Sequence, residues 1–187
     1  MLNLVLLGAP GAGKGTQAER LVQKYRIVHV STGNIFREEI SKQSGLGLEV
    51  KNYLDSGKLV PDELTVAVLT QRISQPDCGK GFLLDGFPRT VAQAKALGKY
   101  LSSAQQKLNA VIYLELSQEQ AVARLSKRGR ADDNPETITN RFMVFKEQTE
   151  PLIAYYKEEN LLQTVNGDKD VDSVFESVCQ TVDSVKV

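Results

Sequence analysis

A glycine-rich stretch near the start of the chain reads Gly8-Ala9-Pro10-Gly11-Ala12-Gly13-Lys14-Gly15-Thr16. The apolar run before it, residues 2–7, predicts a buried strand, and the mixed polar and apolar pattern of residues 16–24 predicts a helix after it. Glycines let the backbone curl so that successive amide N–H groups point at an anion, and the N-terminus of a helix adds partial positive charge. This order of elements is typical of a loop that binds the phosphates of a nucleotide.

The spacing of Gly8, Gly13 and Lys14 fits the P-loop motif, in which the lysine neutralises the outer phosphates. The next position departs from the motif, because Gly15 stands where serine or threonine is usual and Thr16 provides the hydroxyl one place later. The alternative is a glycine-rich turn that binds nothing. The strand before the stretch and the helix after it favour the phosphate-binding interpretation.

The composition is that of one globular domain. The chain has 187 residues, 41% of them apolar and 25% charged, and its formal net charge is zero, which argues against general attraction to nucleic acid or membranes. No apolar run approaches the length of a membrane span, and the first residues lack the basic start and cleavage site of a signal peptide. We therefore expect a cytoplasmic protein that binds neither nucleic acid nor membrane.

The chain has two cysteines and one histidine. Cys78 and Cys179 are isolated and form no metal-ligand pattern, so we expect both to be structural or incidental and suited to a reducing cytoplasm. His29 lies in the apolar run of residues 27–30, which favours a packed strand histidine over a catalytic one.

Five apolar segments predict strands, with helical patterns between them: residues 2–7, 27–30, 81–85, 110–115 and 161–165. This alternation predicts an α/β fold with a largely parallel sheet and helices on both faces. Ligands bind to such sheets beyond the carboxyl ends of the strands, where the loops after residues 7, 30 and 84 are expected to lie.

Two segments interrupt this pattern, and we interpret them as insertions in a single domain whose core is residues 1–30, 61–126 and 134–187. Residues 31–60 contain helical patterns at 35–42 and 48–54, and residues 127–133 form a short, polar loop. Ser117 and Asn134, the latter followed by a proline, predict the starts of the helices on either side of this loop.

A carboxylate ends the apolar strand of residues 81–85. Asp85 is placed to hold Mg²⁺, directly or through water, as an acidic residue at a strand end does in P-loop proteins. Gly86 permits close approach of the backbone, and Arg89 offers a planar fork for a phosphate. A structural aspartate is the alternative, but the P-loop in the same chain favours the metal site.

Several arginines form a third candidate feature. Arg124 and Arg128 are four residues apart on one predicted helix, where like charges repel, so an anion between them would explain the pair. The others are Arg37, Arg89, Arg130 and Arg141. Fixed cations of this kind stabilise a phosphoryl group in transfer; the alternative is a set of solvated surface arginines. No residue stands out as one that positions water, which favours a second phosphate as acceptor and a mobile lid near Gly129.

Taken together, the motifs resemble those of the adenylate kinase family. They are the P-loop stretch, Ser31-Thr32-Gly33, Asp85-Gly86-Phe87-Pro88-Arg89-Thr90-x-x-Gln93, and Arg124-x3-Arg128-Gly-Arg130-x-Asp132-Asp133. The resemblance extends over about residues 2–178. It implies a monomer with a P-loop NTPase-type sheet, an AMP-binding helical insertion at 31–60 and a lid at 127–133. It also implies reversible transfer of the γ-phosphoryl group of Mg·ATP to AMP, giving two ADP.

The resemblance also implies roles for particular residues. It assigns ATP to Gly11, Ala12, Gly13, Lys14, Gly15, Thr16, Arg128 and Lys169. It assigns AMP to Thr32, Arg37, Lys58, Leu59, Val60, Gly86, Phe87, Pro88, Arg89, Gln93, Arg130 and Arg141. It implies that transfer depends on Lys14, Asp85, Arg89, Arg124, Arg130 and Arg141, and that Mg²⁺ lies at Thr16 and Asp85.

The chain departs from many bacterial members in its lid, which is short and has no cysteine, so no structural zinc is expected. UMP/CMP kinases share the short lid and are the alternative. They typically have an asparagine at the position of Gln93, whereas a glutamine amide suits the donor and acceptor on the edge of adenine. A non-catalytic nucleotide-sensing module is a further alternative, but it would be expected to lack Lys14, Asp85 or the arginines, all of which are present.

Overall fold

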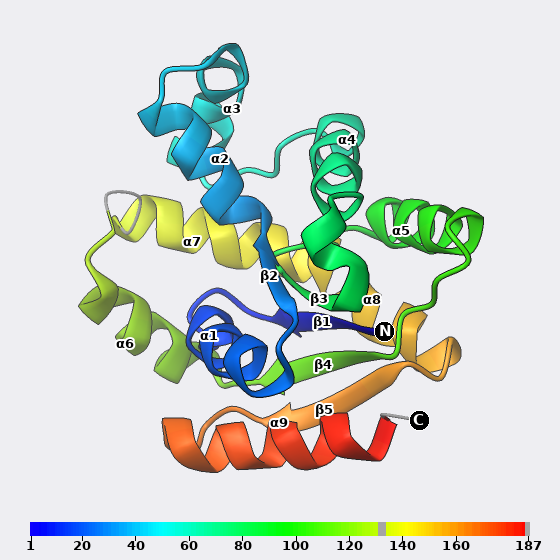
Figure 1. The fold of residues 1–187 in the computed structure, drawn as a ribbon. Helices are drawn as coiled ribbons and strands as arrows, with labels where there is room; N and C mark the ends of the chain where they lie inside the picture. Colours follow the sequence, from blue (N-terminus) through cyan, green and yellow to red (C-terminus); the bar gives the residue numbers. More distant parts are fainter. Residues whose placement is uncertain (131–133, 186–187) are drawn as a thin grey trace.

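The computed structural model describes residues 1–130 and 134–185. Its centre is a sheet of five parallel strands in the order β2-β3-β1-β4-β5 (Figure 1). The strands are β1 Leu2–Gly8, β2 Val28–Ser31, β3 Gly81–Asp85, β4 Ala110–Glu115 and β5 Leu162–Asn166. All five predicted strands are confirmed to within one residue at each end, and so is the parallel α/β fold.

Helices cover both faces of the sheet. The helices of the described chain are α1 Lys14–Tyr25, α2 Thr32–Ser41, α3 Gly45–Asp55, α4 Asp62–Ile73, α5 Val91–Ser103, α6 Gln118–Arg128, α7 Pro135–Val144, α8 Pro151–Glu158 and α9 Val171–Val185. A 3-10 turn, Pro76–Lys80, precedes β3, and a π-helical turn, Phe145–Thr149, follows α7. None of these helices is long and apolar enough to cross a membrane.

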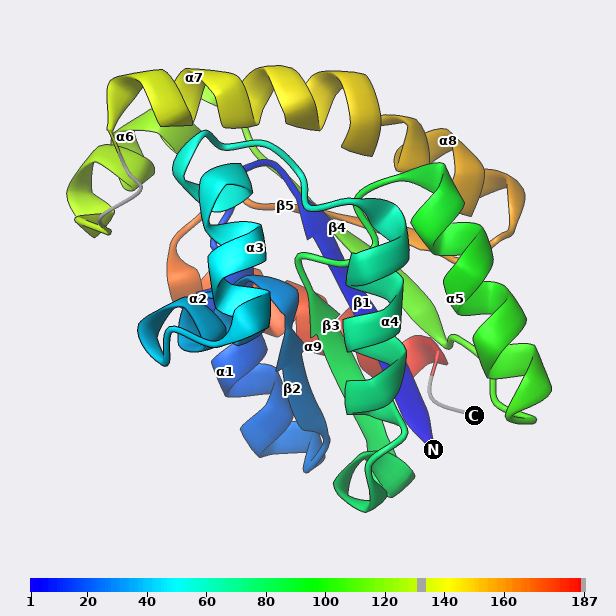
Figure 2. The same cartoon turned by 90° about the horizontal axis from the view of Figure 1, so that it is seen from above.

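The side chains of successive strand residues pack alternately in two separate hydrophobic cores, because neighbouring residues of a strand point to opposite faces of the sheet. Leu4 and Leu6 of β1 pack with α1 and α9 on one face, and Val5 and Leu7 pack with α4, α5 and α8 on the other. Figures 1 and 2 show these two layers on opposite sides of the sheet. The two cysteines are free and buried, one in each core.

The segment of residues 31–60 folds as a helical arm. Its helices α2 and α3 stand away from the sheet (Figure 1) around a small core of Phe36, Val50 and Val60. The two predicted helices of this segment are present but begin earlier than predicted. Ser31 and Ser44 each accept a hydrogen bond from the backbone N–H three residues later, and these caps set the first turns.

The helices on either side of the second predicted insertion begin where the sequence places them. Ser117 accepts a hydrogen bond from the N–H of Gln120 at the start of α6, and Asn134 accepts one from the N–H of Thr137 at the start of α7. Gly129 follows α6 in the left-handed conformation, with φ +70°. Residues 131–133 of the predicted lid lie outside the described residues.

Candidate active site

A cavity of about 750 Å³ lies at the carboxyl ends of β1, β2 and β3. Most of the site residues predicted from the sequence line it. They are Gly11, Ala12, Gly13, Lys14, Gly15, Thr16, Thr32, Arg37, Lys58, Leu59, Val60, Asp85, Gly86, Pro88, Arg89, Gln93, Arg124, Arg130, Arg141 and Lys169. Two predicted residues are not among them. Phe87 is buried in the core beside α5, and the side chain of Arg128 lies outside the described part of the chain.

The glycine-rich loop packs directly on α6. Gly11 has φ +84°, and a β-carbon there would lie 2.4 Å from the carbonyl oxygen of Ala121. Only glycine fits both the conformation and the space. Lys14 folds over the same loop, where its Nζ donates to the carbonyl oxygens of Gly8 at 2.8 Å and Ala9 at 3.0 Å. The loop is thereby held against both the sheet and the helix that leads to the predicted lid.

The N-terminus of α1 opens on the cavity. Its N-cap, Gly13, has φ +84° and provides no side-chain acceptor for the first N–H groups of the helix. The first turn contains no acidic residue. Uncapped N–H groups, the helix dipole and the ammonium of Lys14 together form a site for an anion.

Asp85 ends β3 beside this helix terminus, and its Oδ2 would lie 3.9 Å from a β-carbon built on Gly15. Burial by itself would raise the pKa of the Asp85 carboxyl. His29, Lys14 and Arg89 outweigh burial, so the pKa of Asp85 is held below its ordinary value. The carboxylate is therefore ionised at neutral pH and can attract a cation.

The donor set near Asp85 fits Mg²⁺. The hydroxyl of Thr16 and the carboxylate of Asp85 both line the cavity and are hard oxygen ligands of the kind that Mg²⁺ takes. Within residues 1–130 and 134–185, no group of three or more His, Cys, Asp or Glu side chains is arranged to hold a metal. An ion here would take its remaining ligands from water and phosphate, as Mg²⁺ in nucleotide sites usually does.

His29 is closer to the site than the sequence indicates. It lies on β2, but its Nε2 is 3.5 Å from Oδ2 of Asp85, and the residue lines the cavity. The sequence contains one signal for this proximity, because both residues fall near the carboxyl ends of predicted neighbouring strands. An apolar run alone could not reveal the pairing of β2 with β3.

The loop after β3 is joined to α2 at one carbonyl group, that of Gly86. The carbonyl oxygen of Gly86 accepts hydrogen bonds from Oγ1 of Thr32 at 3.0 Å and from Nε of Arg89 at 2.9 Å. Gly86 has φ +79°, and a β-carbon there would come within 3.1 Å of Nη2 of Arg89. Desolvation lowers the pKa of Arg89 and Asp85 opposes this effect, but arginine ionises at so high a pH that the guanidinium stays charged.

Gln93 lies one turn further on, in α5, and is 1% exposed. Its Oε1 accepts from the backbone N–H of Arg89 at 2.8 Å, and its Nε2 donates to Oδ1 of Asp62 at 2.7 Å. Thr90 donates to the second oxygen of Asp62 at 2.9 Å. Thr149, in the π-helical turn, donates to the carbonyl oxygen of Arg89 at 2.9 Å. Sequence reasoning missed both Asp62 and Thr149.

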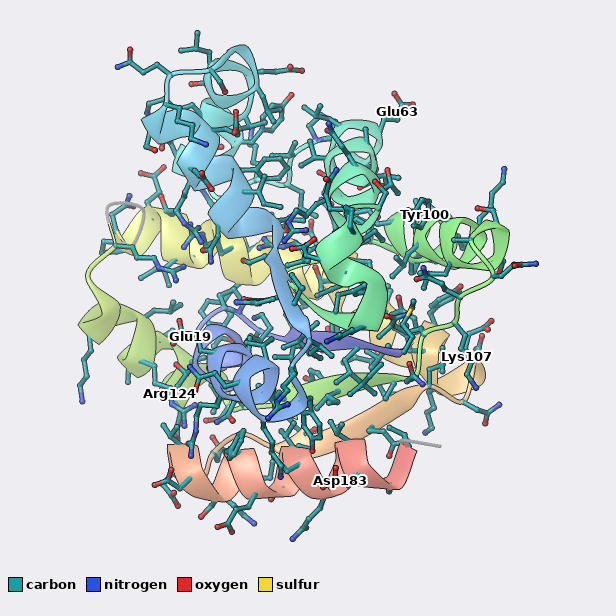
Figure 3. The ribbon with its side chains drawn as sticks, viewed as in Figure 1. Glu19, Glu63, Tyr100, Lys107, Arg124 and Asp183 are labelled. Atoms are coloured by element: carbon teal, nitrogen blue, oxygen red, sulfur yellow. The ribbon has the colours of Figure 1, made fainter. Side chains whose placement is uncertain are left out.

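The arginines approach the cavity from different elements. Nη2 of Arg124 donates to the carbonyl oxygen of Gly167 at 2.9 Å, so Arg124 spans from α6 toward the start of α9 (Figure 3). Its Nη1 would lie 4.0 Å from a β-carbon on Gly13. Nη2 of Arg37 donates to Oδ1 of Asn34 at 2.6 Å. The predicted site arginines whose side chains are described therefore all line one cavity.

The helical arm closes the cavity against α7. Oγ1 of Thr137 donates to the carbonyl oxygen of Asp55 at 3.0 Å, and Nδ2 of Asn140 donates to that of Ser56 at 3.3 Å. Gly57, with φ +71°, lies against Thr137 and Arg141. Lys58 to Val60 therefore face the cavity immediately after a turn that is fixed to α7.

Comparison of the sequence with known proteins places this chain in a family. Residues 6–161 match the family model of adenylate kinase. The chain is 46% identical over 189 residues to an adenylate kinase of Bacteroides thetaiotaomicron, with 99% of this chain and 100% of the relative covered. It is 51% identical over 174 residues to one of Mycolicibacterium smegmatis, with 93% and 95% covered. It is 40% identical over 214 residues to one of Enterococcus faecalis, with 97% and 99% covered.

Proposed function

The chain belongs to the adenylate kinase family, and we propose that the residues lining its cavity carry out the reaction of that family. The enzyme transfers a phosphoryl group from ATP to AMP and forms two ADP. One observation carries the assignment of residues. Lys14 and Asp85 line the same cavity as Gly86, Arg89 and Gln93, so a phosphate donor and a phosphate acceptor can meet there.

The donor nucleotide binds at the glycine-rich loop. Backbone N–H groups at the start of α1 surround its phosphates, and Lys14 exchanges its carbonyl partners for phosphate oxygens. Arg124 adds charge beside Gly13, and Arg128 belongs to this half by its position in the sequence. The loop of Gly167 and Lys169 lines the cavity beyond Arg124 and is placed to contact the base.

The acceptor nucleotide binds between the helical arm and α5. Thr32, Arg37 and the residues Lys58 to Val60 contribute from the arm, and Gly86, Pro88, Arg89 and Gln93 from the loop after β3. Arg89 and Arg37 hold the α-phosphate as charge-assisted donors. The amide of Gln93 binds the edge of adenine, which has one donor and one acceptor.

Transfer of the phosphoryl group then depends on the positions and charges of the side chains around it. The lysine and the arginines surround the site where negative charge spreads over the moving phosphoryl group, and fixed cations stabilise that distribution. Thr16 and Asp85 would hold Mg²⁺, directly or through water, and the ion would supply further positive charge beside the phosphates. Arg130 and Arg141 line the cavity near the acceptor half and contribute to the same field. Because both substrates bind by phosphate groups, the same residues serve the reverse reaction.

The proposal also covers the substrates, the oligomeric state and the location of the enzyme. We expect small-molecule substrates only, ATP, AMP and ADP, and a monomer that works in the cytoplasm without structural zinc. A UMP/CMP kinase is the closest alternative. The buried amide of Gln93 supports the adenine nucleotide, and so do the adenylate kinases that the chain resembles.

Replacing Gln93 with leucine tests the assignment of the acceptor half. Removing the amide leaves the donor and acceptor of adenine unpaired in a buried site, which costs about 1–3 kcal/mol. We expect kcat/KM for AMP to fall by about ten- to a hundredfold while the dissociation constant of ATP is nearly unchanged. An unchanged AMP preference in the variant would overturn the assignment of Gln93.

A further inference from the structure

The orientation of the Gln93 side-chain amide is fixed by its neighbours. The backbone N–H of Arg89 can only donate, and it meets Oε1 at 2.8 Å. A carboxylate can only accept, and Asp62 meets Nε2 at 2.7 Å. Turning the amide over would place two donors together at Arg89 and two acceptors together at Asp62. The Gln93 side chain is 1% exposed and both contacts are partly buried, which makes either mismatch costly.

Asp62 is itself held in place. Its second carboxylate oxygen accepts from Oγ1 of Thr90 at 2.9 Å. That hydroxyl accepts from the backbone N–H of Gln93 at 3.1 Å as the cap of α5, so its own proton is committed to Asp62. Asp62 is also the first residue of α4, where the helix dipole favours a negative charge. The carboxylate therefore belongs to a closed set of contacts between α4 and α5.

The fixed amide has one acceptor lone pair on Oε1 and one N–H on Nε2 that the protein contacts leave over. Adenine presents N6–H as a donor and N1 as an acceptor, which match these two groups in order. Hypoxanthine has the same size but presents O6 as an acceptor and N1–H as a donor, the reverse order. The orientation of one amide therefore distinguishes a 6-amino from a 6-oxo purine.

We propose that Asp62 is a specificity-determining residue of the acceptor site, which sets the orientation of Gln93 and so selects AMP over IMP. The inference rests on the proposed function, because it requires Gln93 to contact the acceptor base. Asp62 acts through Gln93 and is a positioning residue. It holds the amide from the side of α4 as Arg89 holds it from the loop after β3.

The test is the ratio of kcat/KM for AMP to kcat/KM for IMP, with ATP as donor, in the full chain. Asp62→Asn keeps the shape but can donate as well as accept, so the reversed amide gains a partner there and is opposed at Arg89 alone. Asp62→Ser does the same with a hydroxyl, and it provides a second test of the prediction if Asp62→Asn does not fold. We expect the ratio to fall about tenfold in both, the equivalent of one discriminating hydrogen bond, and KM for ATP to stay the same.

Glu63→Gln is the matched control. Glu63 is acidic and lies in the same first turn of α4, but it is exposed and points away from α5 (Figure 3). The control removes one negative charge from the same first turn of α4. It therefore measures how much of any change in the ratio comes from the interaction of that charge with the helix dipole. We expect it to leave the AMP:IMP ratio unchanged, and Asp62→Glu, which retains the carboxylate, to keep most of the ratio.

The Gln93→Leu variant distinguishes a failure of this inference from a failure of the proposed function on which it rests. If Gln93→Leu removes the AMP:IMP discrimination and the Asp62 variants retain it, the role of Asp62 is overturned and the base-reading role of Gln93 stands. If Gln93→Leu leaves discrimination intact, the acceptor-site assignment itself fails. In the Gln93→Leu background, Asp62→Asn should change the ratio no further, and an additional tenfold fall there would also overturn the proposal.

Discussion

The backbone N–H of Arg89 donates to Oε1 of Gln93 at 2.8 Å. The residue proposed to hold the acceptor phosphate and the residue proposed to bind the acceptor base are thus parts of one hydrogen-bonded turn at the start of α5. A phosphate and a base bound at the two ends of this turn would be held at a fixed separation. Selection of the base is then coupled to placement of the phosphate beside Lys14 and Asp85.

Replacing Lys14 with methionine should abolish phosphoryl transfer and leave the fold intact. The ammonium is placed to neutralise charge that grows during transfer, and loss of such a group typically costs about a hundred- to a thousandfold in kcat. Steady-state kinetics and circular dichroism would measure the two effects. Lys95→Met, on the exposed side of α5, is the control and should behave as the wild type. Near-normal turnover in Lys14→Met would remove the P-loop assignment.

Replacing Arg89 with alanine should weaken AMP binding more than ATP binding. The guanidinium reaches the cavity beside Gly86, on the acceptor side, and a charge-assisted hydrogen bond is worth about 1.5–3 kcal/mol. Calorimetric titration should therefore show AMP affinity lower by about ten- to a hundredfold and ATP affinity little changed. Equal losses for both nucleotides would argue against this placement.

Gly11 is expected to tolerate no side chain. Gly11→Ala would force a β-carbon to 2.4 Å from the carbonyl oxygen of Ala121 at a positive φ, so we expect a loss of more than about 1 kcal/mol in unfolding free energy. Gly98→Ala is the matched control, because Gly98 lies inside α5 with nothing within 4 Å of the added carbon. It should gain about 0.5–1 kcal/mol. Denaturant unfolding of both variants checks the sign of each change.

The purified protein should contain no stoichiometric zinc. Cys78 and Cys179 are buried in separate cores on opposite faces of the sheet, so they cannot both bind one tetrahedrally coordinated zinc ion. A chelator should leave the melting temperature unchanged when no nucleotide is present. Elemental analysis that finds one zinc per chain would show that a site exists elsewhere.

Local signals in the sequence predict the framework well. A strand buried on both faces requires an apolar run, so residues 81–85 and 110–115 are found without error. Caps such as Asn134 act within one turn and are visible in the chain itself. The glycine-rich loop before α1 is predicted for the same reason, because its glycines and Lys14 are neighbours in sequence.

Contacts between distant segments could not be predicted. Asp62 reaches Gln93 across 31 residues, and this depends on how α4 packs against α5. The proximity of His29 to Asp85 depends likewise on the pairing of two strands. Phe87 stands inside a binding motif, yet its large apolar side chain is more stable in the core than facing the cavity.

The most direct measurement of the central claim is kcat/KM of the wild-type enzyme for AMP, UMP and CMP with Mg·ATP as donor, in one coupled assay. The account predicts that AMP is preferred by at least about tenfold, because the amide of Gln93 is buried and fixed in the orientation that adenine requires. A preference for UMP or CMP would contradict the account.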